Sequence, residues 1–426
     1  MLKLYKFLIS GITEQSSKNE DIILVVDTNL GLEHARRFGQ DGYTTYYAVV
    51  HGQPYPKMQD EICGYGFSDV RKIWDWGEGL EKGANIIVFT DSGFGHLASW
   101  LRKEGYYVIG ADGKSERLEL DRVYVRKVLQ QLGIDVPPGK VVRGVKQVVE
   151  AVRNARGKVF VKINRYRGTV ETFGTDDPAE AEAILSRGAF KILGDNVTFV
   201  VENELKGVEI GVDAWFNGRQ FIPIVAETIE YQGCGNTTKF VKLQDSIWYD
   251  VLKRLEPWLA KNGYVGMFCL EGFYDGKTIY VTDITPRFSY ICSYAYPKVI
   301  KNYTEFMIGV AKGSDITPEP LGKYSVQIGV YTDDPNTWRV IHYNRDDTEW
   351  IAYRRVIKRD DDIWFVPGDY VVAVGISAAD DLKTAMKQAI ERASAVETSN
   401  IYCQGKEFEV YLNDVLSKAK KLGYTF

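Results

Sequence analysis

The sequence predicts an α/β protein with a doubly wound parallel sheet near the N-terminus, a larger α+β part in the middle and a small α+β part at the C-terminal end. Apolar strands alternate with helical patterns in the first third of the chain, and β-rich segments dominate the remainder. A length of 426 residues suits two to four domains at roughly 100–200 residues each. We expect the last boundary at a Gly- and Pro-containing linker, residues 313–322.

Three strands are expected in the first third of the chain. Apolar runs begin at Asp21, Ala84 and Tyr106, and helical patterns follow the first two runs, at 30–38 and 94–102. A strand, a helix and a strand in this order predict a parallel sheet.

A different pattern begins at Asp121. Two helices are expected, at 125–132 and 145–152, before a strand at 158–163 and a helix that starts with Pro at position 178, which the first turn tolerates. One amphipathic helix, at 247–259, and one helix near the C-terminus, at 382–393, are also expected. The other β segments are 197–202, 208–216, 221–227, 265–273 and 278–284.

The composition excludes several functional classes. The chain has 53 Lys+Arg and 57 Asp+Glu, a net charge of −4, so no broad nucleic-acid-binding surface is indicated. Five scattered cysteines without a CxxC motif and four histidines without HExxH predict neither a disulfide framework nor a zinc centre. No apolar run reaches the roughly 18–20 residues of a membrane span. The start has no signal-peptide pattern, so we expect a cytoplasmic protein without a membrane partner.

Two phosphate-binding patterns are incomplete. Residues 113–115 (Gly-Lys-Ser) would end a P-loop, but Val108 stands where that loop needs its first glycine. Residues 93–98 (Gly-Phe-Gly-His-Leu-Ala) match the relaxed dinucleotide pattern of a nicotinamide-dependent oxidoreductase. They follow an internal strand, and nothing later in the chain supplies hydride-transfer chemistry, so we interpret them as a structural turn.

Charged residues in the middle of the chain suggest a nucleotide site. Lys162 lies inside an apolar strand, where its amine needs an anion or a pocket. Glu271 and Asp283 lie on consecutive strands, Arg287 follows them, and Arg122 opens a helix. Basic side chains neutralise phosphates, and carboxylates hold a divalent cation, so this set suits a triphosphate bound with magnesium.

The order and spacing of these motifs resemble the ATP-grasp superfamily, and over nearly the whole chain they look most like phosphoribosylamine–glycine ligases. The segments that carry the resemblance are 31–35, 115–122, 200–209, 281–288 and 368–375 with the helix after it. The resemblance implies a Rossmann-like domain at 1–117, an ATP-grasp domain at 118–312 with a lid at about 140–195, and an α+β domain at 313–426.

The same resemblance implies an ATP-dependent enzyme that joins small-molecule carboxylate and amine substrates, here glycine and phosphoribosylamine. It implies Mg²⁺ or Mn²⁺ as cofactor, and a monomer or a homodimer. The residues that would contact ATP are Arg122, Lys162 and Arg165 at the phosphates, Glu202 and Leu205 at the adenine, and Glu209 at the ribose.

The resemblance also implies a metal site and a substrate site. Asp283, with Glu271 and Thr285, would hold the metal ion. Arg287 would steady the transition state that leads to an acyl phosphate and would also contact the substrate. Asn236 would contact the substrate as well.

Two segments depart from the family pattern. The loop 164–169, expected to cover the phosphates, has a single glycine, and residues 288–292 (Phe-Ser-Tyr-Ile-Cys) replace the family's Phe-Gly-Asp-Pro-Glu. The second departure indicates a changed acceptor. The alternatives are a divergent ligase with another amine or acid, a nucleotide-binding protein without ligase activity, and the oxidoreductase above.

Structural interpretations stay open for several of these residues. Arg122 could be a solvated helix-start residue, Glu202 and Glu209 could be exposed strand ends, and Arg287 could pair with Asp283. Residues 232–235 are expected to form a flexible loop that exposes a thiol.

The register of the hairpin around residues 275–276 is open as well. A two-residue turn there would place Asp283 opposite Phe268 and turn Glu271 to the other face. A five-residue loop, 274–278, would place Glu271 opposite Val281, with Asp283 as its diagonal neighbour.

Overall fold

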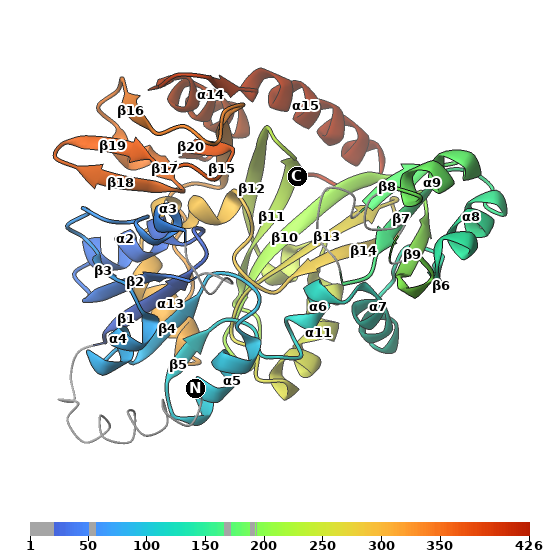
Figure 1. Cartoon of the computed structure of the whole chain (residues 1–426), viewed down its shortest axis with the longest axis horizontal. Coiled ribbons are helices and arrows are strands. Elements are labelled where there is room, and N and C mark those ends of the chain that lie inside the picture. Colours follow the sequence, from blue (N-terminus) through green and yellow to red (C-terminus); the bar gives the residue numbers. More distant parts are fainter. Residues whose placement is uncertain (1–20, 51–56, 166–171, 188–191, 193) are drawn as a thin grey trace.

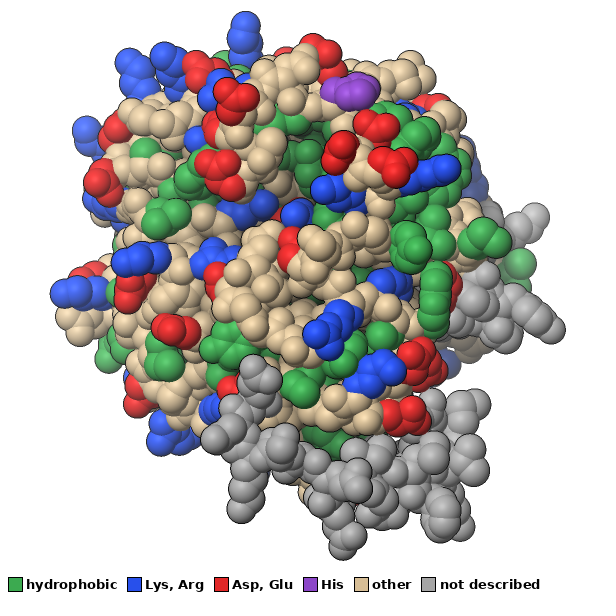
Figure 2. Space-filling model, turned by 90° about the vertical axis from the view of Figure 1, so that its left-hand side faces the viewer, with side chains coloured by type: hydrophobic (Ala, Val, Ile, Leu, Met, Phe, Trp, Pro, Cys, Tyr) green, Lys and Arg blue, Asp and Glu red, His purple; other side chains and the backbone are tan. Residues whose placement is uncertain are grey.

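The computed structural model describes residues 21–50, 57–165, 172–187, 192 and 194–426. Figure 1 shows a parallel sheet and a small four-stranded sheet at opposite ends of the molecule, with the long strands of a third sheet between them. Among the described residues, no helix is both long and apolar enough to cross a membrane. Figure 2 shows acidic and basic side chains interspersed over the face that it presents.

The N-terminal sheet has five parallel strands in the order β3-β2-β1-β4-β5, which confirms the predicted parallel sheet. The strands β2 and β3 were not expected, because one is rich in tyrosine and the other is very short. Its elements are β1 (Ile23–Asp27), α2 (Leu32–Gln40), β2 (Thr45–Val49), α3 (Met58–Glu61), β3 (Arg71–Ile73), α4 (Trp76–Glu81), β4 (Ile86–Phe89), α5 (Gly95–Lys103) and β5 (Tyr107–Ile109).

Two helices lead from this sheet into a four-stranded antiparallel sheet of order β6-β9-β7-β8. Asp121 caps the second helix by accepting from the amide of Tyr124 at 3.0 Å. The elements are α6 (Arg117–Leu120), α7 (Arg122–Gln131), β6 (Gly139–Arg143), α8 (Val145–Arg153), β7 (Val159–Ile163), β8 (Thr172–Thr175), α9 (Pro178–Leu185), a 3-10 helix (Gly194–Asn196) and β9 (Thr198–Asn203).

One face of the four-stranded sheet forms a core with α8 and α9, and the other face carries the charged side chains of Lys162 and Glu202. Val159, Val161 and Ile163 of β7 are buried in that core. Strand alternation places Phe160 and Lys162 on the opposite face. The strand therefore holds Lys162 rigidly while its amine points away from the core.

The third sheet has nine strands in the order β14-β13-β10-β11-β12-β15-β20-β17, with β22 also paired to β15. The pairing of β12 with β15 crosses the expected boundary at 312. The elements are β10 (Val208–Phe216), β11 (Ile224–Tyr231), β12 (Gly235–Lys242), a 3-10 helix (Leu243–Asp245), α11 (Tyr249–Lys261), β13 (Gly266–Tyr274), β14 (Ile279–Thr285), β15 (Tyr324–Thr332), β17 (Ile351–Tyr353), β20 (Val371–Ala379) and β22 (Ile401–Cys403).

The exposed thiol expected in the loop at 232–235 is wrong, although residues 232–234 do form a turn that leads into β12. Cys234 is buried, and its thiol donates to Oε1 of Gln404 at 3.2 Å. The remaining elements are a 3-10 helix (Cys292–Tyr294), α12 (Tyr296–Val299), α13 (Tyr303–Ala311), β16 (Arg339–Tyr343), a 3-10 helix (Thr348–Trp350), β18 (Val356–Arg359), β19 (Asp362–Phe365), α14 (Leu382–Ser394), β21 (Val396–Glu397) and α15 (Gly405–Lys421).

Candidate active site

A cavity of about 790 Å³ lies between the nine-stranded sheet and the face of the four-stranded sheet that carries Lys162 and Glu202. Ten of the eleven predicted site residues line it, although their roles stay predictions. They are Arg122, Lys162, Glu202, Leu205, Glu209, Asn236, Glu271, Asp283, Thr285 and Arg287.

Strand alternation brings the acidic side chains to one face of the nine-stranded sheet. Glu209 and Asp213 of β10 share this face because they are four positions apart, and every second side chain of a strand points to the same side. Glu271 of β13 lies opposite Gly211, between them. The short glycine leaves room above β10 for the side chains on both sides.

The hairpin of β13 and β14 has neither of the two expected registers. Tyr274 pairs with Ile279, so the connection has four residues, and a β-bulge then shifts the register between Glu271 and Gly272. As a result, Asp283 lies directly opposite Glu271. The bulge was not foreseeable from the spacing of the two acids, because it inserts a residue that sequence alternation does not mark.

Asp283 pairs with two basic side chains. Nη1 of Arg122 donates to Oδ1 of Asp283 at 2.9 Å, so Arg122 is more than a solvated helix-start residue. Nζ of Lys162 lies 3.6 Å from Oδ2 of Asp283 and donates to the carbonyl oxygen of Thr282 at 3.3 Å. Lys162 and Arg122 come from different elements and converge on the same carboxylate.

Glu202 faces the cationic side of the cavity. Its carboxylate lies 3.2 Å from Nζ of Lys162 and 3.1 Å from Nη1 of Arg126. Arg126 was missed from the sequence, although its position one helical turn after Arg122 places both on one face of α7. Glu202 is buried, so it is not an exposed strand end.

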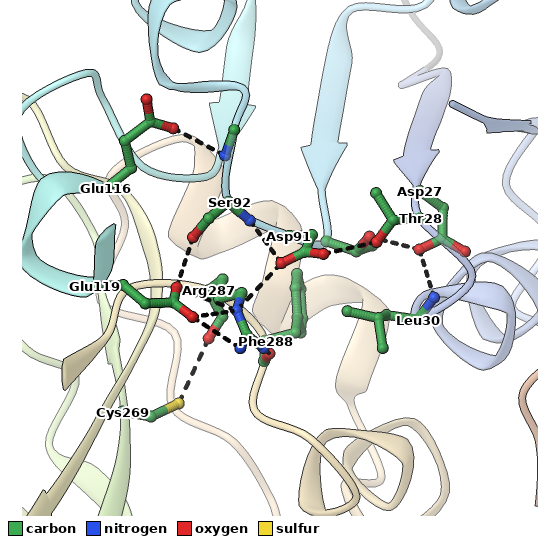
Figure 3. A network of polar contacts seen from close by, with 12 residues as sticks. Asp27, Thr28, Leu30, Asp91, Ser92, Glu116, Glu119, Cys269, Arg287 and Phe288 are labelled. Carbon is green, nitrogen blue, oxygen red and sulfur yellow. Dashed lines mark hydrogen bonds and ion pairs between the residues drawn. The ribbon is translucent and has the colours of Figure 1, made fainter. Parts of the chain in front are cut away.

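Arg287 pairs with Glu119 and Asp91, which excludes the expected alternative of a pair with Asp283 (Figure 3). Its Nη2 lies 2.9 Å from Oε1 of Glu119, and its Nε lies 3.2 Å from Oδ1 of Asp91. Burial lowers the pKa of Arg287, but the two carboxylates outweigh it and raise the pKa overall. Asp91 also accepts from the hydroxyl of Thr28, so the network links the cavity to the parallel sheet.

Three cavity carboxyls have raised pKa values. Burial, followed by repulsion from Asp283, raises the pKa of Glu271 to about 8, although its side chain reaches the open cavity. Burial, with Asp213 and Glu209 nearby, raises the pKa of Glu230 to about 7. Burial also raises the pKa of Glu209. Such a group of carboxyls favours the binding of cations.

Asp213 and Glu230 were missed from the sequence. Asp213 accepts from the hydroxyl of Ser289 at 2.9 Å, the thiol of Cys292 at 3.0 Å and the phenol of Tyr296 at 2.5 Å. The even spacing from Glu209 to Asp213 was a usable signal. Glu230 could not be found, because its strand was expected to end at residue 227.

Arg165 does not reach the cavity in this structure. Its guanidinium donates to Oδ2 of Asp121 at 2.8 and 3.0 Å, and its side chain is 63% exposed. Most of the loop expected to cover the phosphates lies outside the described residues.

The turn at Gly93 has the structural role expected for it. One carboxylate oxygen of Glu116 accepts from the amide of Gly93 at 3.0 Å and from the amide of Gly95 at 2.9 Å. The carboxylate of Glu116 therefore already accepts from the amides that would otherwise donate to a dinucleotide phosphate.

The donor set fits one divalent cation shared with phosphates. Among the described residues, no group of three or more Asp, Glu, His or Cys side chains is placed to hold a metal by itself. Glu271 and Asp283 nevertheless face each other directly, and Asp283 helps to raise the pKa of Glu271. Mg²⁺ is commonly bound by one or two carboxylates together with substrate phosphates, which suits this pair.

Comparisons with known proteins agree on the architecture. No protein-family model matches the sequence. Among curated proteins, the carbamoyl phosphate synthase large chain of Clostridium beijerinckii is 25% identical over 251 residues, which cover 55% of this chain and 23% of that protein. That of Clostridium acetobutylicum is 26% identical over 216 residues, 49% of this chain and 20% of that protein. The chain thus spans less than a quarter of the length of these relatives.

Three solved structures cover most of the chain. The phosphoribosylamine–glycine ligase of Thermotoga maritima has a TM-score of 0.69 at 16% identity, over 90% of this chain and 99% of that one. The biotin carboxylase domain of Hydrogenobacter thermophilus 2-oxoglutarate carboxylase, in complex with MgADP, has a TM-score of 0.67 at 13% identity, over 90% of this chain and 92% of that one. The N5-carboxyaminoimidazole ribonucleotide synthetase of Thermus thermophilus has a TM-score of 0.63 at 15% identity, over 88% of this chain and 99% of that one. The cavity between two antiparallel sheets and these likenesses show that the chain has the fold of the ATP-grasp superfamily.

Proposed function

We propose that this protein is an ATP-dependent ligase that activates a carboxylate as an acyl phosphate and transfers the acyl group to an amine. The observation that carries the proposal is the meeting of opposite charges at Asp283, where Arg122 and Lys162 face a pair of opposed carboxylates. A triphosphate and a divalent cation need this combination, because the phosphates require positive charge and the cation requires oxygen ligands.

The nucleotide would lie between the two antiparallel sheets. Arg122 and Lys162 would exchange Asp283 for phosphate oxygens, and Glu209 would accept from the ribose hydroxyls. Leu205 and Glu202, at the connection between the sheets, would lie beside the adenine.

Glu271 and Asp283, with Thr285, would hold Mg²⁺ or Mn²⁺. The ion, when bound, would neutralise charge on the β- and γ-phosphates. The remaining work belongs to the chain. Lys162 and Arg122 orient the γ-phosphate in line with the attacking carboxylate and stabilise the charge that develops in transfer.

The reaction would have two steps. A carboxylate oxygen of the substrate attacks the γ-phosphorus, the bond to the β–γ bridging oxygen breaks, and ADP leaves with the electron pair. The amine nitrogen then attacks the acyl carbon, phosphate leaves, and the amine proton passes to solvent. Arg287, oriented by Glu119 and Asp91, would stabilise the negative charge on the acyl phosphate.

Glycine and phosphoribosylamine are the substrate pair that we propose first, supported by the likeness to a phosphoribosylamine–glycine ligase over 90% of the chain. Another acid and amine are the second candidate. The contacts of Ser289 and Cys292 with Asp213 favour it, because they lie in the segment that departs from the family pattern.

The test measures ADP release from Mg-ATP with a panel of acids and amines that includes glycine with phosphoribosylamine. We expect release that depends on both an acid and an amine, with an amide identified by mass. Nucleotide binding without turnover across the panel would contradict the ligase, and would support a nucleotide-binding protein.

A further inference from the structure

A second polar group lies in the cavity away from the hairpin carboxylates. Glu230 of β11 lies directly opposite Asn236 of β12, and both line the cavity. Asn236 is only 1% exposed, and its side chain helps to hold down the pKa of Glu230, which burial raises.

The amide oxygen of Asn236 is a buried acceptor without a partner. Within the described part of the chain, no hydrogen-bond donor reaches Oδ1 of Asn236, and this buried atom belongs to a residue that lines the cavity. A buried acceptor without a donor costs free energy, so the oxygen of Asn236 is suited to a ligand that brings an N–H group.

The charge of the cavity favours a cationic ligand. Among the described residues that line it, eight are carboxylates and three are basic. The three basic residues, Arg122, Lys162 and Arg287, already pair with carboxylates other than Glu230. Glu230 therefore has no cation of the protein paired to it among the described residues, although Asp213 and Glu209 repel its negative charge.

The position of the pair separates it from the phosphate-transfer site. Glu230 is on β11, which is three strands away from β14 and Asp283 in the order β14-β13-β10-β11. At about 4.8 Å per strand, the two strands that carry these carboxylates are roughly 14 Å apart across the sheet. A group held at Glu230 is therefore too distant to be the nitrogen that attacks the acyl phosphate.

We propose that Glu230 and Asn236 bind the ammonium group of an elongated substrate whose reacting group lies near Asp283. The ammonium donates to the carboxylate of Glu230 and to Oδ1 of Asn236, and it supplies the positive charge that this end of the cavity lacks. The substrate class is an aliphatic compound with a protonated amine remote from the carboxylate or amine that reacts. This proposal rests on the proposed ligase function and specifies the substrate of its second form, in which another acid and amine replace glycine and phosphoribosylamine.

The test uses calorimetric binding to the full-length protein with Mg-ADP present. The probes are L-lysine and 1,5-diaminopentane, and their respective partners, L-norleucine and n-pentylamine, lack the second amine. We expect at least one probe with two amines to bind about tenfold or more tightly than its partner. Glu230→Gln and Asn236→Leu should remove that difference and leave the affinity for Mg-ADP unchanged. Glu409→Gln, which removes an exposed carboxylate on α15, is the matched control and should keep it.

The outcomes separate this proposal from the ligase. Equal binding of every probe and its partner, or a difference that survives Glu230→Gln, would overturn the ammonium site even if the protein forms amides from neutral amines. Selective binding that Glu230→Gln abolishes supports the site even if no acid and amine pair releases ADP, in which case the ligase is wrong.

Discussion

Lys162 pairs with two carboxylates in the cavity, and each of them has a second basic partner. Its amine lies near Glu202 and Asp283, yet Arg126 also pairs with Glu202 and Arg122 also pairs with Asp283. Both acids therefore keep a cationic partner when Lys162 is removed. Its loss should affect chemistry far more than folding.

We expect Lys162→Ala to lower the rate of acid- and amine-dependent ADP release by about 10²–10³. Asp283→Ala should do the same through loss of a metal ligand. Circular dichroism melting checks that both variants fold as the wild type does. Lys158→Ala, at an exposed position just before the same strand, should stay active. Wild-type rates in either cavity variant would contradict the site.

Glu230 should make stability depend on pH. Folding raises its pKa to about 7 from an ordinary 4.5, so the native state keeps a proton that the unfolded state releases. Stability therefore falls as pH rises through this window. The other titratable groups that interact with it are Glu271, Tyr290, Cys292, Tyr331 and Tyr411.

We predict that Glu230→Gln stabilises the protein increasingly between pH 4.5 and pH 7, by about 1–3 kcal/mol at the upper end. Urea unfolding of wild type and variant at each pH measures the difference, in which the titration of Glu271 largely cancels. Glu409→Gln should show no such trend. A difference that stays constant with pH would mean that Glu230 is not perturbed by folding.

At the scale of elements, strands with plain alternation were predictable and their registers were not. The alternation of apolar residues marked β10, β13 and β14, whereas glycines at 233 and 235 concealed the start of β12. The four-residue turn and the β-bulge of the hairpin are set by packing, so spacing alone could not align Glu271 with Asp283. Likewise, Arg287 and Glu119 are 168 residues apart, and only the fold brings them together.

The bulged hairpin depends on a glycine at position 272. A Cβ atom there would lie 2.7 Å from the carbonyl oxygen of Tyr280 and 3.0 Å from the ring of Trp248, which is fully buried. We predict that Gly272→Val destabilises the protein by about 1–3 kcal/mol, because neither neighbour can move aside freely. Urea unfolding tests this, with Lys277→Val in the exposed turn as control. Equal stability of the two variants would show that the hairpin tolerates a side chain at 272.

For the whole molecule, the cavity depends on chain that lies beyond the expected boundary at 312. Gly235 to Lys239 of β12 pair with β15, and α15 packs against β10, β11 and β12. Near the C-terminus, the phenol of Tyr424 donates to Glu227 at 2.8 Å, and Lys239 donates to the carbonyl of Thr425 at 2.9 Å. The strands of the candidate site are thus covered and extended by the last hundred residues.

We therefore predict that a fragment of residues 1–312 does not form the site. Its β12 would be an unpaired edge, and the apolar residues that β15 and α15 cover would meet water. The fragment should bind a hydrophobic dye, lack a cooperative urea transition and fail to bind Mg-ADP. Co-expression with residues 313–426 should abolish dye binding and restore both the cooperative transition and Mg-ADP binding, because the missing strand and helix can then pair. A fragment that unfolds cooperatively alone, and binds Mg-ADP as tightly as the full chain, would show that the sheet needs no partner beyond residue 312.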